Sequence, residues 1–219
     1  MSLEITVRGS AEQSHPAERA TVSLAAAVEG GDKQAVVAEA IAIQEPLSAQ
    51  LRELTDLRAV RTWSSDQVHV LSHRPWAADG QRSEPVHVAR LRVRAEFVDF
   101  ERLSSLLDDW SGVDGVEIAG IAWDVTAANR RAYEAEARTA AVEDAVTKAQ
   151  AYADAVGRGR VVAVQVADPG MLTGPGASAG DVQLLQASAK VAGDDGPVLD
   201  LAPEEILVRV EVDARFRAD

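Results

Sequence analysis

Apolar and polar residues alternate almost without interruption along residues 88–97 and 206–216. A period of two residues is typical of a β-strand that buries one face and exposes the other. Shorter alternating runs cover residues 3–7 and 20–28, and strand patterns return between 60 and 97 and from about 116 to 125. Long strands with one polar face predict a mainly antiparallel sheet packed by helices on one side, which is an α+β fold.

Three segments have the three-to-four residue spacing of an amphipathic helix. The first follows Asp32, which can cap its N-terminus, and runs to Leu54, but Pro46 inside it predicts a kink or a break. A short helix is expected after Asp99. The third spans about 129–156, and its predicted packing stripe consists of Val142, Ala145, Val146, Ala149, Tyr152, Ala153 and Val156.

The last third of the chain combines a short apolar run with a long segment rich in proline and glycine. Residues 161–166 are apolar on both sides, which predicts a strand that is central or covered on both faces. Residues 168–203 form a Pro/Gly-rich connection, and its length predicts either a mobile linker or a functional loop. We expect one unit spanning 1–219, and the alternative is two subdomains, 1–98 and 99–219, that share a sheet.

The composition excludes several classes of partner and chemistry. The formal net charge is −13 and the pI is about 4.7, which oppose nucleic-acid binding because that affinity depends on Lys and Arg neutralising phosphates. Without cysteine, the chain has no disulfide, thiolate nucleophile or cysteine-based metal site. No apolar run is long enough to insert into a membrane, and the first residues do not form an export signal, so a cytoplasmic location is expected.

No motif for catalysis or for metal or cofactor binding is present. His69 and His73 are four residues apart in a strand-like stretch, which separates them by about 13 Å, too far to share one ion. No nucleophile elbow, P-loop or dinucleotide fingerprint occurs. We therefore expect no catalytic, cofactor-binding or metal-ligating residue, no cofactor and no enzymatic activity. The alternative is a hydrolase or lyase whose carboxylate pair does not stand out among 35 acidic residues.

Three arginines, Arg90, Arg92 and Arg94, share the polar face of one predicted strand. They could bind an anion or another small ligand. The simpler expectation is cross-strand pairing with acidic residues such as Glu211 and Asp213.

Four tryptophans divide into two groups by their position in the pattern. Trp110 and Trp123 fall on predicted core stripes, whereas Trp63 and Trp76 lie near strand ends. Because exposed aromatic side chains often anchor interfaces, Trp63 and Trp76 are candidates for a subunit contact.

Several segments together resemble the SIMPL-domain family of bacterial proteins. They are the opening VRGSAE with the strand AERATVSL, VRT at 60–62, DFERLSSLLD at 99–108, and the helix ARTAAVEDAVTKAQAYADAVG at 137–157. An apolar strand, a Pro/Gly-rich loop and a terminal alternating strand follow in the family's order. The resemblance covers essentially the whole chain, and its motifs are packing motifs.

The resemblance implies an α+β fold, a tendency to form ring-like homo-oligomers, and a loosely defined role in envelope or oxidative-stress physiology. It brings no active site. Most relatives carry an export signal, and we expect none here because the first residues do not have that pattern. With no cysteine and only Met1 and Met171, a role in stress physiology would be indirect. We therefore expect a non-enzymatic binding or scaffold protein whose partner is another copy of itself, associating through sheet edges and its long helix.

Overall fold

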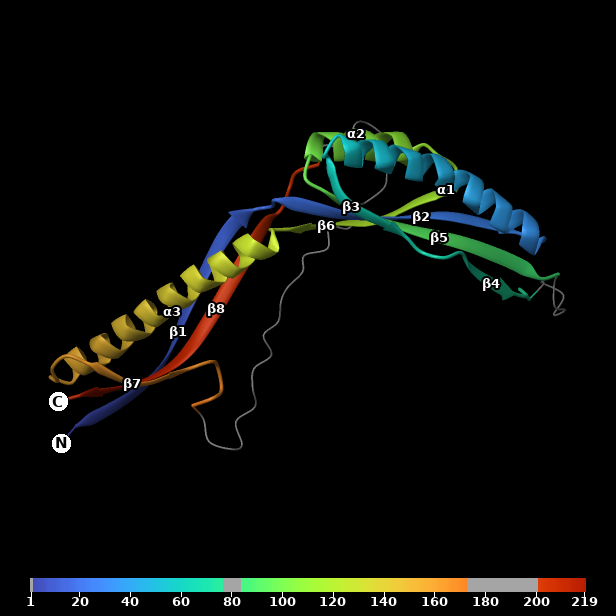
Figure 1. Ribbon diagram of the computed structural model, residues 1–219. Coiled ribbons are helices and arrows are strands. Elements are labelled where there is room, and N and C mark those ends of the chain that lie inside the picture. Colours follow the sequence, from blue (N-terminus) through green and yellow to red (C-terminus); the bar gives the residue numbers. More distant parts are fainter. Residues whose placement is uncertain (1, 77–83, 173–200) are drawn as a thin grey trace. The chain divides into compact units, whose positions relative to one another are not determined.

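The computed structural model describes residues 2–76, 84–172 and 201–219, which fold into two compact units. The three-stranded unit contains the described residues 2–16, 125–172 and 205–219 (Figure 1). The five-stranded unit contains 17–124, apart from 77–83, and 201–204. The chain thus leaves the first unit after Pro16 and re-enters it at Val125.

The five-stranded unit is an antiparallel sheet with two helices on one face (Figure 1). The strand order is β3-β5-β2-β6, and β4 pairs with β5 farther along the edge that β3 also uses. Its elements are β2 (Arg19–Gly30), α1 (Lys33–Asp56), β3 (Val60–Ser65), β4 (His69–His73), β5 (Val86–Phe97), α2 (Phe100–Ser111) and β6 (Val116–Asp124).

The alternation in β2 and β5 forms the core of this unit. Phe97 is fully buried, with Ala20 of β2 on one side and Val60 of β3 on the other. Trp110 of α2 and Trp123 of β6 are buried as predicted. The other fully or nearly fully buried side chains of the core include Val22, Leu24, Ala26, Leu51, Ala89, Val93, Ala95, Leu103 and Leu107.

Helix α1 begins as predicted but is not broken by its proline. The Asp32 carboxylate accepts hydrogen bonds from the backbone N–H groups of Gln34 and Ala35, which also lower the pKa of Asp32. Of the two predicted outcomes at Pro46, a kink or a break, the break is wrong, because the helix continues to Asp56. Leu47 and Leu51 are buried just after the proline, and their burial helps offset the one hydrogen bond that proline cannot donate.

The three-stranded unit packs one long helix along an antiparallel sheet. Its elements are β1 (Leu3–Pro16), α3 (Ala127–Ala155), β7 (Val162–Ala167) and β8 (Glu205–Ala218), in the strand order β1-β8-β7. Strand β8 is therefore the central strand, and all fourteen residues of β1 pair with it. Helix α3 runs beside β1 and β8 (Figure 1). Both units confirm the predicted α+β class with helices on one side of an antiparallel sheet.

The buried stripe of α3 consists of alanines at every fourth position. Ala137, Ala141, Ala145, Ala149 and Ala153 have no exposed surface. The prediction that Val146, Tyr152 and Val156 belong to this stripe is wrong, because all three are exposed. The reason is the close approach of the helix to β1 at Gly9, where a Cβ atom would lie 1.9 Å from the carbonyl oxygen of Ala141. Only the smallest side chains fit between two backbones at that distance.

The alternative division at residue 98 differs from the structure. The two units have separate sheets, and β1 belongs with β8 because those strands pair across about 200 residues of intervening sequence. Most of the Pro/Gly-rich connection predicted over 168–203 lies outside the described residues, which include only 168–172 and 201–203 of it.

Candidate functional site

The predicted arginine face is the sheet face of the five-stranded unit that points away from α1 and α2. Arg90, Arg92 and Arg94 alternate along β5 with buried residues that face the helices. Arg90 forms an ion pair with Glu117 of β6 at 2.7 Å. Arg92 and Arg94 are exposed and have no ion-pair partner in the described residues. Their neighbours on β2 are the small residues Ala25 and Ser23.

The expected pairing of these arginines with Glu211 and Asp213 is wrong. Both acidic residues lie on β8 in the other unit, where Arg8 is their partner. The error has a simple cause, since alternation shows which residues share a face of a strand but not which strand lies beside it.

The two candidate interface tryptophans differ in their surroundings. Trp63 of β3 is half-buried, and the guanidinium of Arg52 from α1 lies 5.7 Å from its ring centre. This cation–π geometry places Trp63 on the helix-covered side. Trp76 is 70% exposed and lines an open hollow of about 350 Å³ together with Ser72, His73, Arg74 and Pro85.

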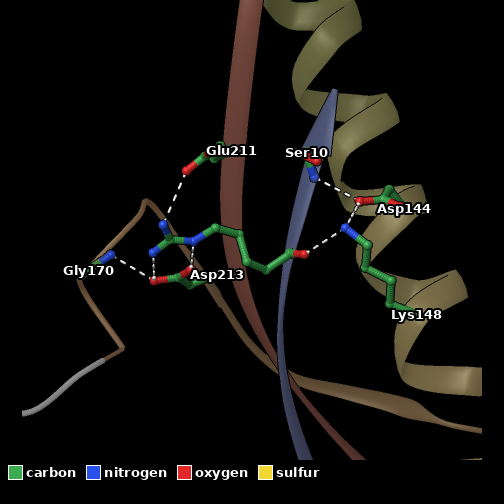
Figure 2. A network of polar contacts seen from close by, with 7 residues as sticks. Ser10, Asp144, Lys148, Gly170, Glu211 and Asp213 are labelled. Atoms are coloured by element: carbon green, nitrogen blue, oxygen red, sulfur yellow. Dashed lines mark hydrogen bonds and ion pairs between the residues drawn. The ribbon is translucent and has the colours of Figure 1, made fainter. Parts of the chain in front are cut away.

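A polar network in the three-stranded unit ties the segment after β7 to the sheet (Figure 2). Asp213 is nearly buried, and its carboxylate accepts hydrogen bonds from Arg8 Nε at 2.8 Å and from the N–H of Gly170 at 2.7 Å. The bond from Arg8 lowers the pKa of Asp213, burial opposes this shift, and the Gly170 N–H reinforces it. The segment that follows β7 is thereby held against β8.

Side chains of α3 cover the outer edge of β1. The N–H of Ser10 donates to Asp144 at 2.8 Å, and Lys148 donates to the carbonyl oxygen of Arg8 at 3.1 Å (Figure 2). Asp144 and Lys148 also pair with each other at 2.6 Å, and this contact and the Ser10 N–H lower the pKa of Asp144. Backbone groups of an edge strand that are already bonded in this way are not free to pair with another strand.

The opposite edge of this sheet, β7, has a different character. Val162, Val164 and Val166 are each 50 to 59% exposed. No described strand pairs with the outer edge of β7. The prediction of a central strand, or one covered on both sides, is therefore wrong. A short uncharged run rich in valine is compatible with a central strand and with an edge strand, and the sequence alone does not distinguish the two.

The described residues contain neither a membrane-spanning helix nor a cluster of metal-ligating side chains. None of the described helices combines the length and the apolar character needed to cross a bilayer. In residues 2–76, 84–172 and 201–219, His, Asp and Glu side chains do not gather in groups of three that could hold a metal ion. His69 and His73 both lie in β4, as strand residues four apart.

Comparison with known families identifies the chain. No curated protein matches it. Residues 5–216 match the family described as SIMPL, protein of unknown function (DUF541), and this match extends over both units. The matched range includes the helix and the alternating strands on which the resemblance to this family was based. The chain therefore belongs to the SIMPL family.

Proposed function

We propose that this protein is a non-enzymatic scaffold or binding protein that self-associates through the edge strand β7. The observation that carries the proposal is the contrast between the two edges of one sheet. Side chains of α3 bond backbone groups of β1, whereas β7 presents three half-exposed valines and no charged residue. An exposed apolar edge strand is a template for pairing with another strand.

The expected strength of such a contact is modest. Full burial of a valine contributes about 1.5 kcal/mol, so completing the burial of six half-exposed valines in two copies contributes roughly 4 kcal/mol. New backbone hydrogen bonds add to this, while association costs about 4 to 15 kcal/mol in lost freedom. We therefore expect a weak, concentration-dependent equilibrium, on which a larger assembly could build. A link to stress physiology would be indirect, since the chain has no cysteine.

Replacing Val164 with lysine is expected to shift the protein toward monomer. A charge on the apolar edge would have to be desolvated in the contact, whereas in the free chain it lies in solvent. Size-exclusion chromatography with light scattering over a wide concentration range, from about 1 µM to about 1 mM, measures the change in the fraction of monomer. Val113→Lys is the matched control, because Val113 is 42% exposed and belongs to the other unit. A parent protein that stays monomeric over this whole range would contradict the proposal.

The second candidate function is the binding of a carboxylate or another anion by Arg90, Arg92 and Arg94. It is favoured by the exposure of Arg92 and Arg94 and by their lack of an ion-pair partner in the described residues. Citrate should raise the thermal midpoint of the parent protein, because a ligand that binds only the folded state stabilises it. The rise should shrink in Arg92→Ala and persist in Arg158→Ala, an exposed arginine of the other unit. No rise in the parent would end this candidate.

A further inference from the structure

One face of the five-stranded sheet points away from α1 and α2, and no described element of the same unit covers it (Figure 1). The residues of β5 that alternate with its buried core residues point to this open face, and in order they are Val86, Val88, Arg90, Arg92, Arg94 and Glu96. We infer that the open face binds an extended peptide segment that places two carboxylates on Arg92 and Arg94 and an apolar side chain on Leu71. The inference rests on the proposed anion binding and adds to it the class of the partner and the order of its side chains.

The positive charge that this face leaves unneutralised belongs to two arginines. Arg90 is paired with Glu117 of β6 at 2.7 Å. Arg92 and Arg94 are exposed and form no ion pair within the described residues. Asp66 lies beside Arg92, because its N–H donates to the carbonyl oxygen of Arg92 at 2.9 Å, but the side chains of these two described residues are not paired. Two guanidinium groups are therefore available to a ligand.

Acidic residues limit the free pair of arginines at both ends. Beyond Arg94, Glu96 forms ion pairs with Arg19 at 3.4 Å and with Arg61 at 3.5 Å. At the other end, Glu117 of β6 neutralises the next arginine of the strand. A ligand with a longer run of negative charge would meet these carboxylates, and like charges repel. The face therefore favours two carboxylates with uncharged neighbours over a polyanion.

The spacing of the two free arginines matches that of an extended peptide. Arg92 and Arg94 are two residues apart in a strand, which is about 6.6 Å. Carboxylates at alternate positions of an extended peptide have the same spacing and point to the same side, so both can pair with guanidinium groups. Adjacent carboxylates point to opposite sides, and only one of them then reaches the arginines. The neighbours on β2 are Ala25 and Ser23, whose small side chains do not obstruct an approaching chain.

An exposed leucine lies on the same face as the arginines. Leu71 of β4 is 73% exposed and is paired with Val88 of β5. Its neighbour Val70 packs against the core, so the alternation of the strand places Leu71 on the open face. Val88 is four residues from Arg92, about 13 Å along the strand, and four residues of an extended peptide span the same distance. The favoured ligand therefore has two acidic residues at alternate positions and an apolar residue four positions beyond the nearer one.

A single-stranded nucleic acid fits this face less well than a peptide. Its phosphates are repelled by a chain with a net charge of −13. Sites for single strands also supply aromatic side chains on which bases stack, and the residues of β5 that point to the open face include none. Leu71 instead offers the apolar contact that an amino-acid side chain makes.

Titration of the full chain with short blocked peptides, followed by two-dimensional NMR of its backbone amides, tests this order of side chains. The peptide ETETTTL, or LTTTETE for the opposite chain direction, should shift amides of β5 and bind about three- to fivefold more tightly than EETTTTL, which has the same composition. Arg94→Ala should abolish this preference, whereas Arg158→Ala in the other unit should keep it. Leu71→Ser should weaken both peptides by the same factor, because it removes an apolar contact and no charge.

The outcomes distinguish the class of partner from the anion site itself. If citrate raises the thermal midpoint of the parent while neither acidic order is preferred, the peptide is overturned and the anion site stands. If citrate has no effect and no peptide binds, both are overturned. Tighter binding of an oligothymidylate with two phosphates at the same ionic strength would overturn the choice of a peptide. Far-UV circular dichroism confirms that each variant is folded.

Discussion

Gly9→Ala is expected to unfold the three-stranded unit or to destabilise it by about 3 kcal/mol or more. The added Cβ atom would lie 1.9 Å from the carbonyl oxygen of Ala141 and 2.8 Å from the Cβ atom of Ala145. Backbone atoms on both sides would have to separate, because no flexible side chain end is available to move. The alanine stripe of α3 would then lose its contact with β1.

Urea unfolding followed by far-UV circular dichroism measures this loss through the helix signal of α3. Tryptophan fluorescence is the internal comparison, because all four tryptophans lie between residues 17 and 124, in the other unit. Gly31→Ala is the matched control, since a Cβ atom there would meet nothing within 4 Å. If Gly9→Ala unfolds at the same urea concentration as Gly31→Ala, the close packing of α3 on β1 is contradicted.

Phe97→Ala is expected to destabilise the five-stranded unit by about 3 to 5 kcal/mol. The ring is fully buried between Ala20 and Val60, and these neighbours are themselves buried in adjacent strands, which limits how far the site can collapse. Tryptophan fluorescence should show the transition at lower denaturant, because Trp110 and Trp123 belong to the same core.

Val98→Ala provides the control for this substitution. Val98 is the next residue along the chain but is 45% exposed, so its truncation should change the free energy of unfolding by less than about 0.5 kcal/mol. If both variants lose the same free energy of unfolding, Phe97 does not lie on the buried face of β5.

The local sequence pattern predicts those parts of the fold that depend only on residues close together in the sequence. The inward faces of β5 and β8, the cap at Asp32 and the burial of Trp110 follow from alternation or spacing. The division into two units does not, because it depends on β1 pairing with β8 across most of the chain. For the same reason the predicted pairing of Arg90 with acidic residues on β8 is wrong, and Glu117 of β6 is its partner.

The candidate interface was harder to predict than the core. The residues of β7 suggest burial by their composition, but the helix that could cover them packs on β1 and β8 instead. Asp144 and Lys148 have the spacing of an ordinary surface pair, and nothing in that spacing indicates that they also bond the backbone of β1. Both features depend on where α3 lies, and Gly9 and the alanine stripe determine that position.

The central place of β8 has a consequence for how the protein is made. During synthesis from the N-terminus, residues 17–124 emerge with every strand of their sheet and can fold while translation continues. Strands β1 and β7 have no common partner until residues 205–218 leave the ribosome, so β1 has no partner strand while the residues between β1 and β8 are synthesised. A nascent chain of this kind is most exposed to chaperones and to misassembly just before its final strand arrives.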